Sequence, residues 1–227
     1  MIRKLEWMIP VAVLAVATTL ILIFDLDMAA QRALYSADAG WQRGSEIPWS
    51  WCYDFGVAPA WLIAVPALFV AIAAIWRKSW RHIVRPAVFL VLTMSIGPGL
   101  IVNNVLKQNW GRPRPKDIVE FGGKHEFVPV LQKGPRERGN SFASGHAATA
   151  FFLMTPWFIY RFHNRRRATA GLIVGVSYGL LVGLARMIQG AHFASDVLWA
   201  FGVVWFTAFA LDRWLKPGET ASGRAAN

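Results

Sequence analysis

Six long apolar runs divide the sequence, and short polar or charged connectors separate them. They cover Met8–Phe24, Val57–Ile75, Ala87–Leu106, Ala147–Tyr160, Ala168–Ala185 and Phe193–Leu211. A helix needs roughly 20 apolar residues to cross a bilayer, and it satisfies its own backbone hydrogen bonds there. Barrel strands alternate over about 10 residues, whereas these runs are long and continuously apolar. The pattern predicts an all-α integral membrane protein with six transmembrane helices.

Composition supports this interpretation. Of the 227 residues, 55% are hydrophobic and only 16% are charged, against about a quarter charged in an average soluble domain. The fourth run is the shortest, and we expect it to extend back into the polar stretch before it. The first run could be a signal peptide, but no small-residue cleavage site follows Phe24. Cys52 is the sole cysteine, which excludes an intrachain disulfide. We expect one membrane domain over residues 1–227.

The net charge of +11 could indicate nucleic acid, but the distribution of the charges argues otherwise. Lys and Arg are dense in two short connectors beside span ends, WRKSWRHIVR and RFHNRRR. The positive-inside bias acts most strongly on such connectors. We therefore expect lipid headgroups as their partners, no nucleic acid, and both termini in the cytoplasm.

The opposite, outer side carries two longer segments. Ala29–Gly56 could hold a short amphipathic helix at the interface, and Lys107–Ala143 is rich in Gly, Pro and charge. Gly97-Pro98-Gly99 interrupts the third span. Membrane helices tolerate such breaks where neighbours cover the freed backbone groups, so we expect a kink and not a loop.

Candidate chemistry gathers on this outer side at three places. The end of the third span carries Lys107, Arg112 and Arg114. The start of the fourth span carries Ser144, Gly145 and His146. The junction of the fifth and sixth spans carries Arg186, His192 and Asp196. Arg and Lys can hold a phosphate, and a hydroxyl and the N–H groups of a helix start can add donors. The three clusters predict a site for a phosphorylated ligand.

The two histidines suit phosphoryl transfer. His192 and Asp196 are four residues apart, so on a helical turn they share a face. The carboxylate can then fix the imidazole tautomer and leave the other nitrogen free to attack. His146 can protonate a departing alkoxide. No metal or other cofactor is needed. Alternatively, a lone histidine packs at a span end, Asp196 caps a helix, and the loop cations are solvated.

The order and spacing of these residues resemble the type-2 phosphatidic acid phosphatase superfamily. Lys107 to Arg114-Pro115 fits K-x6-RP, Ala143–His146 fits PSGH, and Arg186 to Asp196 fits SR-x5-H-x3-D. The resemblance implies a phosphohistidine on His192 oriented by Asp196, and leaving-group protonation by His146. It also implies phosphate binding by the remaining motif residues, Lys107, Arg114, Ser144, Gly145 and Arg186.

Two positions depart from the motifs, because Ala143 replaces a proline and Ala185 replaces a serine. Neither change removes a catalytic group. Arg112 is additional to the pattern, and its role is open.

The stretch from Trp110 to Ala147 is similar to bacterial lipid A phosphatases of this superfamily. We expect a membrane phospholipid or glycolipid substrate, lipid A first, at the periplasmic face of a bacterial inner membrane. Undecaprenyl diphosphate, phosphatidylglycerophosphate and phosphatidic acid are the other candidates. Vanadate-dependent haloperoxidases share the motifs but are soluble. A transporter or channel would need charges near the midplane of the spans.

Overall fold

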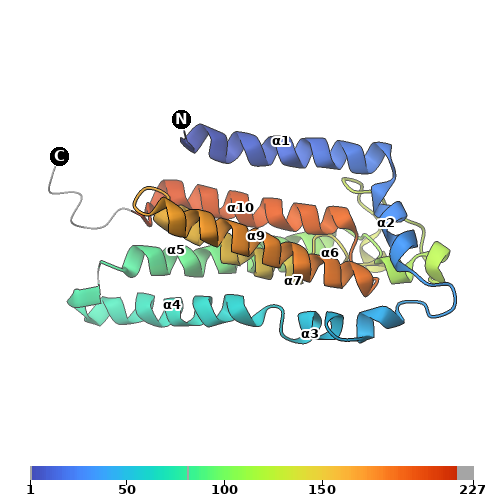
Figure 1. Cartoon of the computed structure of the whole chain (residues 1–227), viewed down its shortest axis with the longest axis horizontal. Coiled ribbons are helices and arrows are strands. Elements are labelled where there is room, and N and C mark those ends of the chain that lie inside the picture. Colours follow the sequence, from blue (N-terminus) through green and yellow to red (C-terminus); the bar gives the residue numbers. More distant parts are fainter. Residues whose placement is uncertain (1, 81, 219–227) are drawn as a thin grey trace.

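A computed structural model describes residues 2–80 and 82–218 of the chain, and its regular structure there is helical throughout. Arg81 and Arg224, two of the cations expected on the cytoplasmic side, lie outside this range. The long helices form an elongated bundle (Figure 1). They are α1 (Ile2–Ile23), α4 (Ala58–Trp76), α5 (Val84–Met94), α9 (Arg165–Ile188) and α10 (Ala194–Leu215).

Five stretches of the described chain are helical, long and apolar enough to cross a membrane. They are Lys4–Ile23, Trp49–Trp76, Val84–Asn109, Arg165–Ile188 and Ala194–Leu215. The first, second, third, fifth and sixth expected spans are therefore confirmed as helices. Only 22% of the residues in the apolar window of the second stretch are buried, against 56% in the last. α10 is thus central, and α4 exposes most of its apolar surface.

The third span stays helical through Gly97-Pro98-Gly99 and does not become a loop. After α5 the chain continues as a π-helix, η3 (Ser95–Leu106), and one further turn, α6 (Lys107–Asn109). Pro98 lies inside η3. Because proline lacks an N–H and crowds the preceding turn, the backbone there changes its hydrogen-bond pattern. This helix carries Lys107 to the end of the bundle.

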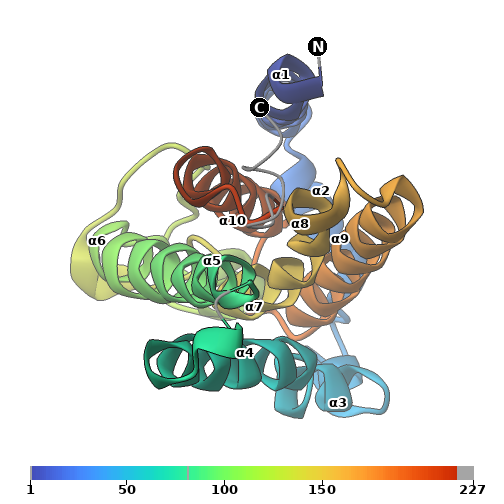
Figure 2. The same ribbon diagram turned by 90° about the vertical axis from the view of Figure 1, so that its left-hand side faces the viewer.

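The fourth expected span, by contrast, is not one long helix. It consists of α7 (Gly145–Phe151), a 3-10 turn η7 (Phe152–Met154) and α8 (Pro156–Tyr160). Pro156 cannot donate to the carbonyl four residues earlier, which favours the break. Figure 2 shows α7 and α8 enclosed by α5, α9 and α10. Within the described chain, five helices are thus long and apolar enough to cross a membrane, and the fourth expected span is a broken segment that is not among them.

A stripe of glycines lets α9 approach this broken segment. Gly171, Gly175, Gly179 and Gly183 recur every four residues along one face of α9. A Cβ on Gly179 would lie 2.1 Å from the ring of Phe151, and one on Gly175 would lie 2.2 Å from the backbone nitrogen of Met154. Small residues at this spacing allow close helix packing in membranes. The glycine stripe therefore lets the broken segment from α7 to α8, which begins next to Ser144 and His146, pack closely against α9.

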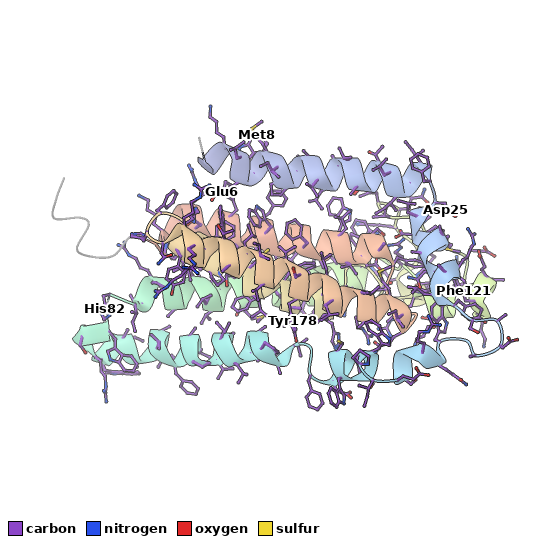
Figure 3. The ribbon with its side chains drawn as sticks, in the orientation of Figure 1. Glu6, Met8, Asp25, His82, Phe121 and Tyr178 are labelled. Atoms are coloured by element: carbon purple, nitrogen blue, oxygen red, sulfur yellow. The ribbon has the colours of Figure 1, made fainter. Side chains whose placement is uncertain are left out.

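The bundle has two distinct ends. Ser144 donates its backbone N–H to the Asp196 carbonyl at 3.2 Å, at the end where α10 begins, which we name the motif end. Arg161 pairs with Asp212 at 2.5 Å, at the opposite end. Figure 3 places Glu6 and His82 at that opposite end, and Asp25 and Phe121 at the motif end. The broken segment thus runs beside α10 from one end to the other.

The segment between α1 and α4, which includes Ala29–Gly56, holds short helices. They are α2 (Leu26–Leu34), the 3-10 turn η1 (Gln42–Ser45) and α3 (Trp49–Asp54). The loop after α6 adds three 3-10 turns, η4 (Pro115–Asp117), η5 (Val119–Phe121) and η6 (Arg136–Arg138). Both segments cover the motif end (Figure 1).

Candidate functional site at the motif end of the bundle

The three motif regions meet at the motif end. The Ser144 N–H bonds to the carbonyl of Asp196, which joins the second region to the third. A Cβ on Gly145 would lie 2.9 Å from Nζ of Lys107, so the glycine leaves room for the amine and joins the first region to the second. Ser144 is the N-cap of α7, and its Oγ accepts the Ala147 N–H at 3.4 Å.

His192 faces Asp196, although not in the way that its spacing suggested. α10 begins at Ala194, so His192 lies before the helix and Asp196 lies in its first turn. The chain folds back because the Phe193 N–H donates to Asp196 Oδ2 at 2.9 Å, a contact typical of a capped helix start. Nδ1 of His192 is 3.6 Å from the same oxygen. This arrangement leaves Nε2 as the nitrogen that can attack.

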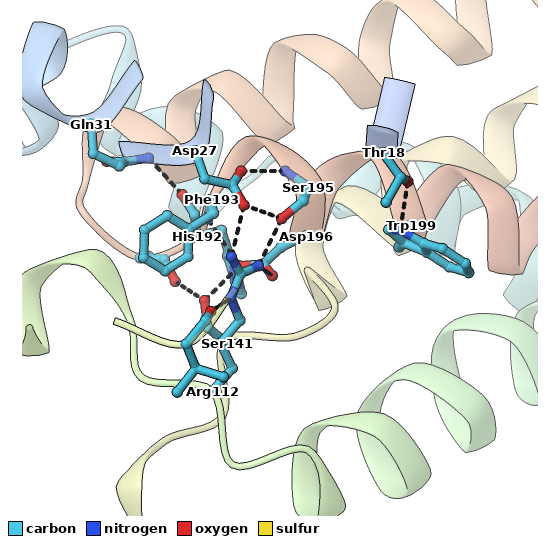
Figure 4. Close-up of polar contacts among 12 residues, drawn as sticks. Thr18, Asp27, Gln31, Arg112, Ser141, His192, Phe193, Ser195, Asp196 and Trp199 are labelled. Atoms are coloured by element: carbon cyan, nitrogen blue, oxygen red, sulfur yellow. Dashed lines mark hydrogen bonds and ion pairs between the residues drawn. The ribbon is translucent and has the colours of Figure 1, made fainter. Parts of the chain in front are cut away.

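Asp196 is fully buried and heavily bonded (Figure 4). Its Oδ1 accepts from the Arg112 guanidinium at 2.6 Å, and its Oδ2 accepts from the Ser141 hydroxyl at 2.6 Å. These contacts fix the carboxylate in one orientation. Asp196 is not the N-cap of α10, which is Phe193, but its carboxylate bonds to the N-cap backbone and also faces His192.

Lys107 and Arg186 lie near His192, and Arg114 lies near both of these cations. Arg114 and Arg186 both lie close enough to Lys107 to act electrostatically on its amine. The Nε atoms of Arg114 and Arg186 are buried and have no hydrogen-bond partner in the described protein. Buried donors are rarely left unbonded, and guanidinium groups match the oxygens of a phosphate. The arrangement suits an anion that would bind these donors.

His146 stacks on Tyr53 of α3, with ring centroids 5.2 Å apart. The Arg186 guanidinium lies 4.6 Å from the centre of the same ring. Arg186 also donates to the Gln189 side chain, whose amide nitrogen bonds to the Trp49 carbonyl at 2.9 Å. Tyr53 and Gln189 therefore hold α3 against two of the residues that the motifs singled out.

Burial and positive charge act on both histidines. Arg186, Lys107 and Arg114 lie close enough to His146 to act electrostatically on its imidazole. Burial lowers the pKa of His192, while the Asp196 carboxylate opposes that change. A neutral His192 can act as a nucleophile. An anion bound among the cations would cancel their charge and so favour a protonated His146.

The structure brings together every residue that the sequence proposed, and it adds others. Arg112, whose role the sequence left open, contacts the Asp196 carboxylate directly. Sequence reasoning did not identify Ser141, Tyr53, Gln189 or Asp27. A polar residue next to the S-G-H motif could have signalled Ser141, but no pattern in the chain points to Asp27.

The two departures from the motifs lie in packed positions. Ala143 and Ala185 are both fully buried. The hydroxyl that reaches Asp196 comes from Ser141, two residues before Ala143. Among the residues that the structure describes, no group of three or more His, Cys, Asp or Glu side chains could hold a metal ion.

The comparisons with known proteins agree with this geometry. The model of the PAP2 superfamily matches residues 86–217. The lipid A 4'-phosphatase of Francisella tularensis subsp. novicida is 33% identical over 142 residues, which cover 62% of this chain and 63% of that protein. The corresponding protein of Rhizobium leguminosarum is 38% identical over 119 residues, 51% of this chain and 50% of its own length.

A third relative, phosphatidylglycerophosphatase B of Bacillus subtilis, is 26% identical over 196 residues, or 80% of this chain and 86% of that protein. The match to the lipid A 4'-phosphatases spans less than two thirds of their length. No solved structure matches the chain. The family model covers more than half of the chain, including every motif residue of the site, so the chain belongs to the PAP2 superfamily.

Proposed function

We propose that the protein is a membrane lipid phosphatase that hydrolyses a phosphomonoester or diphosphate on a lipid headgroup, with lipid A as the favoured substrate. One observation carries the proposal. A buried His192, backed by Asp196, lies near Lys107 and Arg186 at the end of a bundle of apolar helices, and Arg114 lies near both of these cations. A lipid tail can stay in the bilayer while its phosphate enters this cationic site.

In the first step, the lone pair on Nε2 of His192 attacks phosphorus. The bond between phosphorus and the ester oxygen breaks, and His146 gives its proton to the leaving alkoxide. Asp196, whose Oδ2 lies 3.6 Å from Nδ1, stabilises the positive charge of the phosphohistidine. Lys107, Arg114, Arg186 and the Ser144–Gly145 segment hold the three phosphate oxygens, where charge develops in the transition state.

In the second step, water attacks the phosphohistidine. Neutral His146 takes a proton from the water, the bond between phosphorus and Nε2 breaks, and phosphate leaves with His192 neutral again. The cations supply the charge that stabilises both transition states, so we propose that the reaction proceeds without a metal. Vanadate, which mimics pentacoordinate phosphorus, is expected to inhibit.

Lipid A is favoured because two similar proteins are lipid A 4'-phosphatases. Phosphatidylglycerophosphate is supported by the similarity to phosphatidylglycerophosphatase B, and undecaprenyl diphosphate stays a further alternative. A transporter or channel is the non-enzymatic alternative. The gathering of Lys107, Arg186 and His192 at one end of the bundle favours an enzyme over a conduction path.

The test is phosphate release by the purified protein in detergent with EDTA, from a panel of lipid A, phosphatidylglycerophosphate, undecaprenyl diphosphate and phosphatidic acid. We expect release with the highest kcat/KM for lipid A. His192→Ala is expected to retain less than a few per cent of activity, whereas His82→Ala, a change at the opposite end, keeps it. An acid-labile phosphate trapped on His192 supports the mechanism. An active His192→Ala protein contradicts it.

We further propose that the broken segment from α7 to α8 also crosses the membrane, with both termini in the cytoplasm and the motif end in the periplasm. The dense Arg and Lys connectors at the opposite end support this orientation. In a Cys52→Ser background, a cysteine at Lys124 is expected to react with an impermeant thiol reagent in whole cells. A cysteine at Ser79 is expected to react only after lysis. The reverse result would place the site inside the cell.

A further inference from the structure

One guanidinium is shared by two buried carboxylates behind the candidate nucleophile. Arg112 donates to Asp196 Oδ1 at 2.6 Å and to Asp27 Oδ2 at 2.7 Å. The two acids come from different elements, because Asp27 lies in α2 and Asp196 lies in α10. Figure 4 shows them meeting at the same guanidinium.

The pair of acids is fixed by further contacts. Asp27 Oδ1 accepts the Ser195 N–H at 2.9 Å, and Asp27 Oδ2 accepts the Ser195 hydroxyl at 2.6 Å. Asp27 thus binds the first turn of α10, where the helix dipole favours a negative charge. From the same short helix, the Gln31 side chain donates to the His192 carbonyl at 3.0 Å. α2 therefore supports both members of the His192–Asp196 pair.

Water cannot screen the charges of this group. Arg112 and Asp196 are fully buried, and Asp27 is 2% exposed. The Phe193 ring covers the guanidinium, with its centre 4.3 Å away, and Arg112 Nε donates to the Val128 carbonyl at 2.8 Å. One buried positive charge thus lies between two buried negative charges. At low dielectric each of these charges acts strongly on its neighbours.

We propose that Asp27 is a positioning residue of the candidate reaction, which acts through Arg112 to keep Asp196 negative toward His192. The inference rests on the proposed function. Asp27 lies outside residues 86–217, the region that the family model matches. The N-terminal α1–α2 segment would therefore belong to the catalytic apparatus, and not only to the membrane anchor.

The reason is electrostatic. With Asp27 present, Arg112 divides its charge between two carboxylates, so Asp196 keeps charge with which to stabilise a positive imidazole. Without the Asp27 charge, Arg112 neutralises Asp196 alone. The imidazolium and the phosphohistidine at His192 then lose support, the histidine becomes less basic, and attack on phosphorus slows.

Other charged groups act on His192 from several elements, and the test changes none of them except Asp27. The groups that face it, directly or through its neighbours, come from η3–α6, the following loop, α7, α9, α10 and α2: Lys107, Arg112, Arg114, His146, Arg186, Asp196 and Asp27. Changing Asp27 alone leaves every phosphate-binding cation in place.

The experiment compares Asp27→Asn, which keeps the shape and removes the charge, with Asp27→Glu, which keeps the charge. Asp25→Asn is the local control, because Asp25 is exposed and pairs with Arg32 away from the network. Glu6→Gln is the stability control, because Glu6 forms a buried ion pair with Arg161 at the opposite end. The readouts are kcat, KM, inhibition by inorganic phosphate, and titration of His192 by NMR of histidine-labelled protein in detergent.

We expect Asp27→Asn to lower kcat about 10-fold or more, with KM and phosphate inhibition within about 2-fold of wild type. The pKa of His192 and the acidic limb of the kcat/KM profile should both move to lower pH. Asp27→Glu should restore the position of the limb, and neither control should move it. A purely structural role would lower stability without moving His192.

Two results overturn the inference. One is an unchanged His192 titration in folded Asp27→Asn, and the other is an unchanged kcat in that variant. The titration needs no substrate. If the wild type released no phosphate from any lipid, the proposed function would fail, while the coupling between Asp27 and His192 would still be decided by the titration.

Discussion

Arg112→Met tests how strongly the buried charge group contributes to the fold. The substitution keeps an apolar chain of similar length but leaves Asp27 and Asp196 buried without their common cation. Removing one partner of a buried pair costs about 3–5 kcal/mol, because the remaining charge is uncompensated. In a chain of this size, each kcal/mol lowers Tm by about 2–4 °C. We expect Tm to fall by about 6–20 °C.

The assay is thermal unfolding of purified protein in detergent, followed by tryptophan fluorescence. Arg32→Met is the matched control, because Arg32 also pairs with two carboxylates, Asp25 and Glu120, but its side chain is 52% exposed. Exposed pairs contribute little, so this control should unfold within about 2 °C of wild type. Because Arg112 and Arg32 each pair with two carboxylates, the difference in Tm between the two variants measures the effect of burial.

A double variant sharpens the test. Adding Asp27→Asn to Arg112→Met removes one of the two unpaired charges, so the double variant should be more stable than Arg112→Met alone. The expected coupling between the two sites is about 1–3 kcal/mol. If Arg112→Met unfolds within about 2 °C of wild type, or if the double variant is the less stable, the reasoning from unpaired buried charge is refuted.

Two further predictions concern packing and metal. Gly179→Val should lower Tm by several degrees, because a Cβ there would lie 2.1 Å from the Phe151 ring. Leu180→Val on the exposed face should leave Tm unchanged, and equal Tm values for the two variants would contradict this close packing. Phosphate release should persist in EDTA and stop with vanadate, and strict dependence on added magnesium would exclude the proposed mechanism.

The long helices could be predicted because each one satisfies its own backbone and shows as a single apolar run. The break in the fourth span was not predicted, although Pro156 is visible in the sequence. Pro10 and Pro66 lie inside helices that stay continuous, so proline alone does not decide. The difference is the close contact with α9, where a Cβ on Gly171 would lie 2.6 Å from the Pro156 ring.

The candidate site was predictable to a similar degree. Its motif residues could be grouped because the sequence places them at the ends of the expected spans, all on one side. The residues that hold these motif residues in place could not be predicted, because their contacts join segments that are distant in the sequence. Asp27 precedes its partner Arg112 by 85 positions. Arg112 was visible in the sequence as an extra cation, but only the packing of α2 against α10 shows which carboxylates it pairs with.

The two buried acids of the N-terminal segment also bear on how the protein is assembled. Glu6 and Asp27 lie near opposite ends of α1, and their partners Arg161 and Arg112 are synthesised much later. The Trp157 side chain, which also bonds to Glu6, follows it by 151 positions. A carboxylate without a partner avoids hydrocarbon, so both acids stay at the membrane surfaces until these residues arrive. The first helix to enter the membrane is therefore among the last to dock, and its docking completes the charge group behind His192.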